Sequence, residues 1–338
     1  MAKKGILLVN LGTPESTATS DVRKYLREFL MDKRVVDVPA IARWILVNGI
    51  IAPFRGPKSA KEYRKLFTER GSPLRYYTDD LTQLLSERLG EDYQVEYAMR
   101  YQSPSIDEAL TRLKNGNCPS IHVIPLFPQY ASATTGSVID KVMEITMKWQ
   151  IIPSITFTSQ FLEDELFVET VALQGQRLMD KTDYDHFIFS YHGLPERQIR
   201  KGSVGKQCQL GSCCDKFHDR NRFCYRAQCF QTTRLVAEKL GIPEEKYTVS
   251  FQSRLGRDPW IKPYTDIVLH ELVKGGKKKV LAFSPAFVSD CLETTIEVGE
   301  EYKEAFMESG GEQWDLVPSL NVEPTWVDCL EGLVKKHH

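Results

Sequence analysis

The stretch "FIFSYHGLP" (residues 187–195) has the pattern of a buried strand that ends in a sharp turn. Its first residues are aromatic or β-branched, and Gly193 and Pro195 follow where the chain can leave a sheet abruptly. The same pattern occurs in "ILLVNLGTP" (residues 6–14). Two such strand-and-turn segments in a chain of 338 residues indicate an internal repeat.

Three more pairs of apolar runs occur in the same order in the two halves. They are residues 93–106 with 247–260, 121–137 with 280–295, and 154–161 with 314–320. Amphipathic, helix-like stretches lie between the runs, and this alternation predicts parallel sheets covered on both faces. We therefore predict an α/β fold of two similar Rossmann-like domains, each a doubly wound parallel sheet, with a cleft between them.

The repeat also predicts where the domains begin and end. We place an N-terminal domain at residues 1–163, a C-terminal domain at 164–321 with a cysteine-rich insertion at 202–229, and a last helix at 322–338 that packs back on the first domain. In such folds ligands bind outside the carboxyl ends of the strands. The sequence has neither a G-x-G-x-x-G motif after its first strand nor a phosphate-binding G-x-x-x-x-G-K-[ST] motif, so no motif favours nucleotide binding.

The composition excludes several classes of protein. Lys and Arg number 44 against 45 Asp and Glu, so we expect no nucleic-acid partner. The apolar run before Asn10 is too short for a signal-peptide core. The stretch at 41–54 contains Arg43, Asn48 and Pro53 and is too short to span a bilayer. We therefore expect a cytoplasmic protein, in which thiols stay reduced.

A histidine and a set of carboxylates follow two of the predicted strands. His192 ends the strand in residues 187–195, where its imidazole can exchange protons near neutral pH or bind a metal. The segment "FVSDCLETTIEVGEEY" (287–302) follows another strand, and its carboxylates belong to Asp290, Glu293, Glu297, Glu300 and Glu301. Their spacing places several of them on one face of a helix.

Both features also have ordinary structural explanations. A histidine at a turn can be satisfied by local hydrogen bonds, and an acidic helix face can simply be solvated. Together, however, a histidine opposed by carboxylates could accept protons and pass on a divalent cation.

Aromatic and basic residues near the predicted strand ends suggest the shape of a ligand. They are Arg55, Tyr63, Ser72, Arg100, Tyr101, Trp260 and Phe287. Singly they are ordinary core or surface residues, but together they would suit a flat apolar ligand that carries carboxylates, with rings against its faces and arginines on its acids. The apolar stretch at 41–54 is then either a lip over the ligand or a buried helix.

Five of the eight cysteines lie close together in the sequence. They are Cys208, Cys213, Cys214, Cys224 and Cys229. The segment around them is polar, so we expect it to be held by a metal rather than by a core. A C-x4-C step occurs twice and fits either zinc or an iron–sulfur cluster. Four ligands would suffice, which leaves one cysteine spare.

Several motifs resemble, in order and spacing, those of the ferrochelatases, which insert ferrous iron into protoporphyrin IX in the last step of haem synthesis. They are "NLGTP", "GSPL", "MRY", "PLFPQYASATTGS", "SYHGLPER", "VSFQSRLGRDPWIKPYTD" and "FVSDCLET". The resemblance runs from about residue 5 to about residue 330. It implies a lyase with a chelatase-like fold, in which two Rossmann-like domains hold the porphyrin in the cleft between them.

The resemblance also implies roles for individual residues. His192 matches the family's histidine that takes pyrrole protons or binds the incoming iron, Glu293 matches its acidic partner, and Asp290 lies beside it. The family's porphyrin-lining positions correspond to Leu11, Arg55, Tyr63, Ser72, Arg100, Tyr101, Trp260 and Phe287. Protons or metal would be relayed from Glu293 by Glu297, Glu300 and Glu301, with Asp290 as a further candidate. Cys291 occupies a place where some members have histidine.

Two further implications concern the cysteines and the apolar lip. Some ferrochelatases carry a [2Fe–2S] cluster, and the internal cysteine segment resembles that of a bacterial subgroup that holds its cluster there. Cys229 is then the spare thiol if Cys213 and Cys214 both bind, although two adjacent cysteines can both be ligands only with strain, so the choice of four stays open. The lip at 41–54 resembles a segment that meets the bilayer in membrane-associated relatives, which implies peripheral contact with the inner membrane.

Other assignments stay open at the level of the sequence. The same histidine and carboxylates would serve a chelatase that inserts cobalt or nickel into another tetrapyrrole. A bilobal protein of this kind could also be a non-catalytic tetrapyrrole carrier or an iron–sulfur sensor. The sequence does not decide between protoporphyrin and coproporphyrin, although the resemblance favours the former, and it gives no oligomeric state.

Overall fold

The computed structural model describes residues 2–254, 256 and 258–337 and divides into two units. Unit 1 comprises Met1–Phe127, Ser132–Gln160 and Val327–His338, and unit 2 comprises Pro128–Ala131 and Phe161–Trp326. Four residues lie outside the described residues. They are Met1 and His338, at the ends of the predicted domains, and Leu255 and Arg257, in the quoted motif "VSFQSRLGRDPWIKPYTD". The predicted boundary at residue 163 and the packing of residues 322–338 stay predictions.

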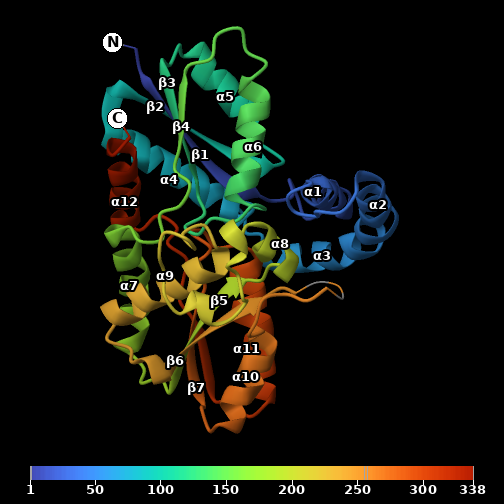
Figure 1. Cartoon of the computed structure of the whole chain (residues 1–338), viewed down its shortest axis with the longest axis vertical. Helices are drawn as coiled ribbons and strands as arrows, with labels where there is room; N and C mark the ends of the chain where they lie inside the picture. Colours follow the sequence, from blue (N-terminus) through green and yellow to red (C-terminus); the bar gives the residue numbers. More distant parts are fainter. Residues whose placement is uncertain (1, 255, 257, 338) are drawn as a thin grey trace. The chain divides into compact units, whose positions relative to one another are not determined.

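Each unit contains one four-stranded sheet, and the two sheets have the same strand order (Figure 1). Unit 1 has the order β2-β1-β3-β4 and unit 2 the order β6-β5-β7-β8, and all neighbours are parallel. The strands are β1 (Lys4–Gly12), β2 (Tyr93–Tyr101), β3 (Ser120–Pro125), β4 (Ser154–Phe157), β5 (His186–His192), β6 (Tyr247–Gln252), β7 (Lys279–Phe283) and β8 (Gln313–Leu316). The predicted repeat of four strands is therefore confirmed.

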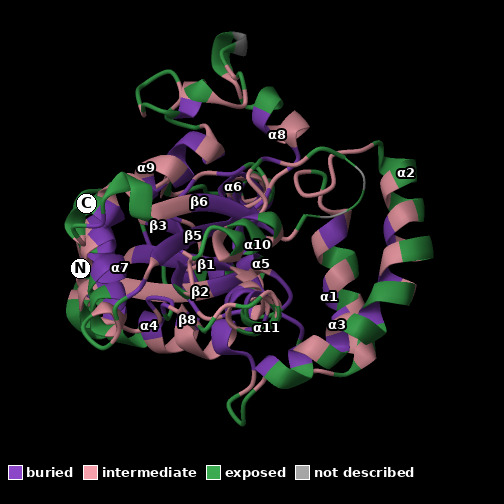
Figure 2. Cartoon of the chain, turned by 90° about the horizontal axis from the view of Figure 1, so that it is seen from below, coloured by how far each residue is buried: buried purple, intermediate pink, exposed green. Residues whose placement is uncertain are grey.

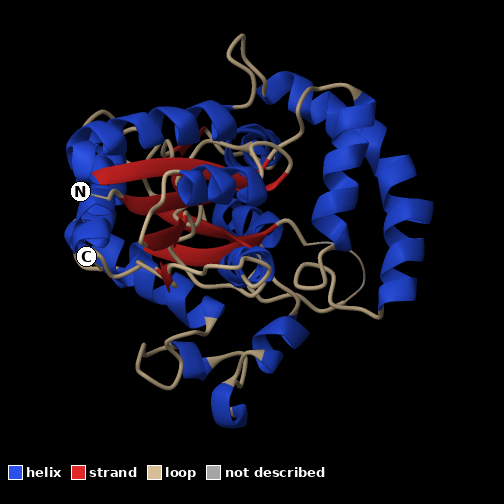
Figure 3. Ribbon diagram, turned by 90° about the horizontal axis from the view of Figure 1, so that it is seen from above, coloured by secondary structure: helices blue, strands red, loops and turns tan. Residues whose placement is uncertain are grey.

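Helices flank the strands in both units, as Figure 3 shows. Those of unit 1 are α1 (Thr19–Met31), α2 (Ala40–Trp44), η1 (Ile45–Ile51), α3 (Ala52–Leu66), α4 (Pro73–Leu89), η2 (Gly90–Asp92), α5 (Ile106–Asn115) and α6 (Thr135–Thr146). Those of unit 2 are α7 (Glu165–Met179), α8 (Glu196–Lys201), η3 (Val204–Lys206), η4 (Ser212–Cys214), α9 (Tyr225–Lys239), η5 (Glu244–Lys246), α10 (Thr265–Lys274), η6 (Leu292–Glu301) and α11 (Tyr302–Glu308). The last helix, α12 (Pro324–Lys335), contributes its residues from Val327 onward to unit 1.

The central strands are apolar along their whole length because helices cover the sheets. In β1 the side chains from Ile6 to Val9 are fully buried, and in β5 so are Ile188 and Phe189. A strand that is buried on both faces shows a continuous apolar run rather than an alternating one. Figure 2 shows these strands as largely buried.

Both first strands leave their sheets through a glycine that lies against the neighbouring strand. A Cβ on Gly12, whose φ is +115°, would meet the carbonyl oxygen of Tyr101 at 2.0 Å. A Cβ on Gly193 would meet the carbonyl oxygen of Gln252 at 2.9 Å. Glycine is needed at both exits because the backbones approach more closely than a side chain allows.

Helices α1, α2, η1 and α3 pack on one another and form a helical arm of unit 1 (Figure 2). Val47 and Ala52 are fully buried within it, whereas the large apolar residues with exposed side chains are Ile41, Trp44, Ile45, Ile50 and Phe54. The stretch at 41–54 is therefore not a buried helix. Over the part of the chain that the structure describes, no helix is both long enough and apolar enough to cross a membrane.

Candidate active site

His192 is the last residue of β5, and its backbone is fixed on both sides. It pairs with Gln252 of β6, and its carbonyl oxygen accepts a hydrogen bond of 2.9 Å from the hydroxyl of Tyr225. The ring lies with its centroid 6.4 Å from that of Trp260 and remains half-buried. Because this fold places ligand sites at the carboxyl ends of strands, His192 lies where chemistry is expected.

The imidazole of His192 has one nitrogen already engaged. Its Nδ1 lies 2.7 Å from the carbonyl oxygen of Gly193. A carbonyl oxygen can only accept, so in the neutral ring Nδ1 carries the proton and Nε2 keeps its lone pair. Nε2 is therefore the atom that can accept a proton or bind a metal.

Gln252 connects the turn at His192 with the acidic helix, and its side chain is only 1% exposed. Its carbonyl oxygen accepts a hydrogen bond of 2.8 Å from the amide of Gly193. Its Nε2 donates to the carbonyl oxygen of Glu293 at 2.8 Å and to Oε2 of Glu297 at 3.0 Å. Its Oε1 accepts from the hydroxyl of Ser190 at 2.7 Å. The backbone of Gln252 thus holds the turn after His192, while its side-chain amide bonds the backbone of Glu293 and the carboxylate of Glu297.

The acidic segment forms a π-helix, η6, instead of the α-helix that its spacing predicts. A π-helix takes more residues per turn, and such segments are frequent at functional sites. Glu293 and Glu297 are half-buried, whereas Glu300 and Glu301 are exposed at the end of the helix. The carboxylates therefore extend from a partly buried position to solvent.

Cys291 precedes the π-helix, and its thiol lies beside Glu293. Burial and the neighbouring carboxylate of Glu293 raise the pKa of Cys291 well above its usual value, so the thiol stays protonated. The hydroxyl of Thr294 closes this first turn, because it accepts from the amide of Cys291 at 2.9 Å and donates to its carbonyl oxygen at 3.1 Å.

Asp290 has partners outside the π-helix. Its carboxylate accepts from the amide of Ser319 at 3.1 Å and from Nδ2 of Asn321 at 2.9 Å, and its own amide donates to Oδ1 of Asn321 at 3.0 Å. These bonds join the segments that follow β7 and β8. The relay role expected for Asp290 stays a prediction.

Arg100 and Tyr101, at the end of β2, both bind Asp32 of the same unit. The Nη2 of Arg100 lies 2.6 Å from Oδ2 of Asp32, and the hydroxyl of Tyr101 donates to the same oxygen at 2.9 Å. Although burial opposes it, these donors together with Ser137 and the amide of Arg34 lower the pKa of Asp32. Burial and Asp32 in turn raise the pKa of Tyr101, which is fully buried.

The other residues expected at a flat ligand are distributed over both units. Leu11, Arg55, Tyr63 and Ser72 belong to unit 1, and Trp260 and Phe287 to unit 2. Arg55 is exposed and Tyr63 is buried on the same helix, α3. Ser72 is only 4% exposed, and its hydroxyl has no hydrogen-bond partner among the described residues. A buried hydroxyl of this kind can donate a hydrogen bond to a ligand.

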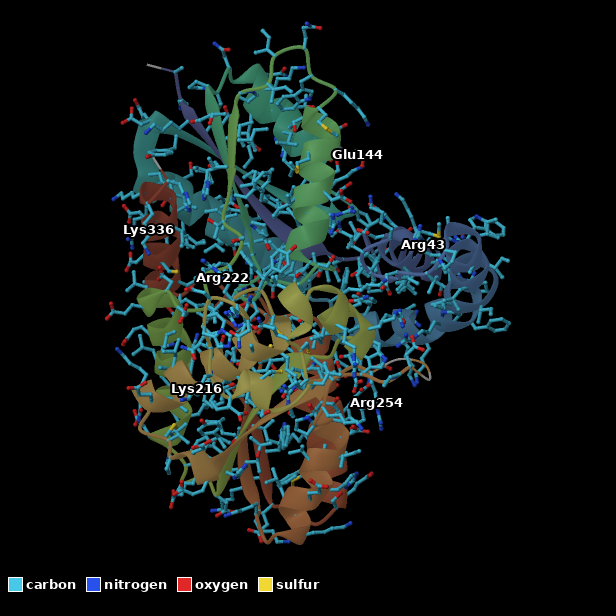
Figure 4. The ribbon with its side chains drawn as sticks, viewed as in Figure 1. Arg43, Glu144, Lys216, Arg222, Arg254 and Lys336 are labelled. Carbon is cyan, nitrogen blue, oxygen red and sulfur yellow. The ribbon has the colours of Figure 1, made fainter. Side chains whose placement is uncertain are left out.

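Four of the five clustered cysteines contact one another in unit 2. The sulfurs of Cys213 and Cys214 lie 4.0 Å apart, the thiols of Cys214 and Cys224 hydrogen-bond, and Cys208 interacts with Cys213. Lys216 and Arg222, labelled in Figure 4, belong to the same segment. Among the residues that the structure describes, no three His, Cys, Asp or Glu side chains are arranged to hold a metal ion.

The fifth cysteine, Cys229, has a different environment. It lies inside α9 with 0% exposure, and its thiol interacts with the hydroxyl of Tyr225. Burial raises the pKa of Cys229, whereas the hydrogen bond from Cys214 lowers the pKa of Cys224. Because the thiolate is the form that binds metal, Cys224 is better prepared as a ligand than Cys229.

Sequence reasoning missed three residues of this site, namely Gln252, Ser253 and Tyr302. Gln252 and Ser253 lie at the end of a predicted strand, where a search for polar residues would have found them. Tyr302 carries no such signal, because only the folded chain brings it to Glu297.

Comparisons with known proteins identify the family of this chain. A protein-family model described as Ferrochelatase matches residues 3–338. A ferrochelatase of Legionella pneumophila (strain Lens) is 44% identical over 334 residues, which are 99% of each chain. A ferrochelatase of Coxiella burnetii (strain CbuK_Q154) is 42% identical over 339 residues, covering 99% of this chain and 94% of the relative.

The fold is similar to that of solved chelatases. SirB from Bacillus subtilis with Fe3+ is 12% identical, with a TM-score of 0.55 over 99% of this chain and 95% of that one. The sirohydrochlorin chelatase SirB from Bacillus subtilis subspecies spizizenii in complex with cobalt is 10% identical, with a TM-score of 0.56 over 99% and 94% of the two chains. At these identities the likeness shows the fold alone, which is two Rossmann-like domains of the chelatase type.

Proposed function

The chain belongs to the ferrochelatase family, and we propose that it inserts ferrous iron into protoporphyrin IX to form protohaem. The observation that carries the proposal is the position of Gln252. Its backbone carbonyl oxygen holds the turn after His192, and its side-chain amide donates to the backbone carbonyl oxygen of Glu293 and to the carboxylate of Glu297. The reaction needs a base and a series of carboxylates, because two pyrrole protons must leave the porphyrin as one divalent cation enters it.

The unprotonated Nε2 of His192 accepts the pyrrole protons in turn. Each N–H bond that breaks leaves its electron pair on the ring nitrogen, which then binds the iron, so porphyrin and Fe2+ yield haem and two protons. Glu293 is the acidic partner, and Glu297 with the exposed Glu300 and Glu301 relays protons or metal between η6 and solvent. Asp290 stays a candidate for this relay, with a carboxylate oriented by Ser319 and Asn321.

The porphyrin is bound by rings and by donors to its propionates. Trp260 and Phe287 in unit 2, with Leu11 and Tyr63 in unit 1, supply apolar contacts, and the exposed Arg55 and the buried hydroxyl of Ser72 bind carboxylates. Arg100 and Tyr101 shape the site from the network around Asp32.

A panel of metals and tetrapyrroles tests the proposal. We expect Fe2+ insertion into protoporphyrin to exceed insertion into coproporphyrin by at least about 10-fold in kcat/KM, because two more buried propionates would need partners. The measurement is the rate of metalloporphyrin formation without oxygen. If cobalt or nickel is inserted faster into another tetrapyrrole, the protein is a chelatase for that metal and tetrapyrrole. If porphyrin binds tightly without turnover, the protein is a carrier.

We also propose that Cys208, Cys213, Cys214 and Cys224 hold a [2Fe–2S] cluster and that Cys229 is spare. The donor chemistry fits, because these four thiols contact one another in a polar segment, whereas Cys229 belongs to the core of α9. When bound, such a cluster supplies a one-electron redox centre and a crosslink for the segment. Zinc is the second candidate, since the C-x4-C step occurs twice.

Membrane contact through the arm is a further part of the proposal. Arg43, labelled in Figure 4, lies on α2 among the exposed apolar residues of the lip. A cluster of exposed apolar side chains beside a basic residue is typical of a surface that enters the lipid interface. Peripheral attachment at the inner membrane would bring the enzyme to an apolar substrate.

Replacing Trp44 and Phe54 with serine should weaken vesicle binding at least about 10-fold, because each side chain loses apolar area that would enter the lipid. The measurement is co-sedimentation with vesicles of mixed neutral and anionic phospholipid. Met147, which is 72% exposed on unit 1 outside the arm, provides the matched control as Met147→Ser. Equal binding by both variants and the unmodified chain would exclude the lip as the contact.

A further inference from the structure

We propose that Gln252, Ser253 and Tyr302 form a carboxylate clamp, a set of positioning residues that orients Glu297 for incoming iron without cancelling its charge. This inference rests on the proposed iron insertion and adds residues to which neither the motifs nor the family resemblance assigns a role.

The carboxylate clamp provides Glu297 with three neutral donors. Gln252 donates to Oε2 at 3.0 Å, the hydroxyl of Ser253 donates to the same oxygen, and the hydroxyl of Tyr302 donates to Oε1 at 3.2 Å. Both oxygens are therefore fixed in direction.

The internal repeat shows what is unusual about this arrangement. The amide of Met99 donates to the carbonyl oxygen of Pro104 at 2.7 Å, and the amide of Phe251 donates to that of Pro263 at 2.8 Å. These matching bonds align β2 with β6 and make Arg100 the counterpart of Gln252. By the same alignment, Tyr101 is the counterpart of Ser253.

In unit 1 the counterpart residues also hold a carboxylate, that of Asp32, but with a compensating cation. Arg100 forms an ion pair with Asp32, whose side chain is only 5% exposed. Ser137 and Tyr101 complete the set of donors. This carboxylate is neutralised and enclosed, as expected for a structural contact.

Glu297 differs from Asp32 in its partners. Among the described residues no lysine or arginine forms an ion pair with Glu297, whereas Arg100 does so with Asp32. Neutral donors orient a carboxylate through hydrogen bonds but leave its negative charge, which at reduced dielectric attracts a cation strongly. The repeat thus holds a carboxylate in both units and leaves only that of unit 2 able to receive a metal.

Two backbone features support a functional rather than a structural clamp. Ser253 has a φ of +64°, a conformation that residues with side chains rarely adopt and that clusters at functional sites. The side-chain amide of Gln252 also donates to the backbone carbonyl oxygen of Glu293, at the start of η6. A shift of this side chain would therefore disturb the first turn of η6 together with the carboxylate of Glu297.

The test uses Gln252→Met, Ser253→Ala and Tyr302→Phe, each of which removes one donor. We expect each variant to raise the KM for Fe2+ about 10-fold, which is the usual effect of losing one hydrogen bond to a charged group. The KM for porphyrin and the kcat at saturating iron should stay within about twofold, because His192 and Glu293 remain. The measurement is oxygen-free steady-state kinetics with each substrate varied in turn.

The matched control is Tyr184→Phe, which removes a hydroxyl donor to the carboxylate of Asp315 in unit 2, outside the proposed site. It should lower the melting temperature without changing the KM for Fe2+. If the three clamp variants instead lose stability and kcat with the KM for Fe2+ unchanged, the clamp is only structural and the inference fails. Failure of the unmodified chain to insert iron would overturn the proposed function itself, a different result.

Discussion

His192→Ala should lower the kcat for iron insertion at least about 100-fold, the usual contribution of a positioned general base. The reason is that Nε2 of His192 has the free lone pair, since Nδ1 is committed to the carbonyl oxygen of Gly193 at 2.7 Å. The fold should survive, because the backbone at this point is held by β6 and by the hydroxyl of Tyr225. Stopped assays of haem formation and thermal unfolding measure the two effects separately.

His270→Ala is the matched control for this substitution. His270 is exposed on α10, and its Nδ1 lies 2.6 Å from the hydroxyl of Ser309. Its loss should leave the rate of insertion within about twofold, as for a surface substitution away from the site. Near-normal turnover in His192→Ala would remove the histidine from the reaction and leave Glu293 and Glu297 to take the protons.

The fold could be predicted from the sequence because its signals are local. The central strands β1 and β5 are buried on both faces and are therefore apolar along their length, and each begins a series of four runs that recurs in the same order in the two units. Corresponding runs take corresponding places in the two sheets. The position of His192 at a strand end was predictable for the same reason.

The carboxylate site could be predicted only in part because its contacts are distant in sequence. Spacing identified Glu293 and Glu297 but indicated an α-helix, since no pattern of side chains distinguishes it from the π-helix η6. Gln252 meets Glu297 across 45 positions of sequence. Such a contact depends on the pairing of β5 with β6, which local periodicity does not specify in detail.

The apolar stretch at 41–54 shows a different limit. Apolar content alone does not predict which side chains are buried, because helices that are apolar nearly all round occur both in cores and at docking surfaces. The structure separates its residues into a buried side at Val47 and Ala52 and an exposed side that includes Trp44 and Phe54.

Cys224→Ser should remove most of the visible absorbance of protein purified without oxygen and lower its iron and acid-labile sulfide content at least about 10-fold. Cys224 is the most informative ligand to change, because the hydrogen bond from Cys214 lowers its pKa and favours the thiolate. The melting temperature should fall as well, because a ligand bound only to the native state stabilises it.

Cys229→Ala is the control that decides between the ligand sets. This thiol is buried in α9 beside Tyr225, so its removal should cost some packing but leave the spectrum and the iron content unchanged. If Cys229→Ala loses its colour and Cys213→Ser keeps it, the ligand set contains Cys229 in place of Cys213. That result is expected if the adjacent Cys213 and Cys214 cannot both bind. A colourless unmodified protein that contains one zinc per chain would replace the cluster with zinc held by the same thiols, because tetrahedral thiolate sites accept either metal.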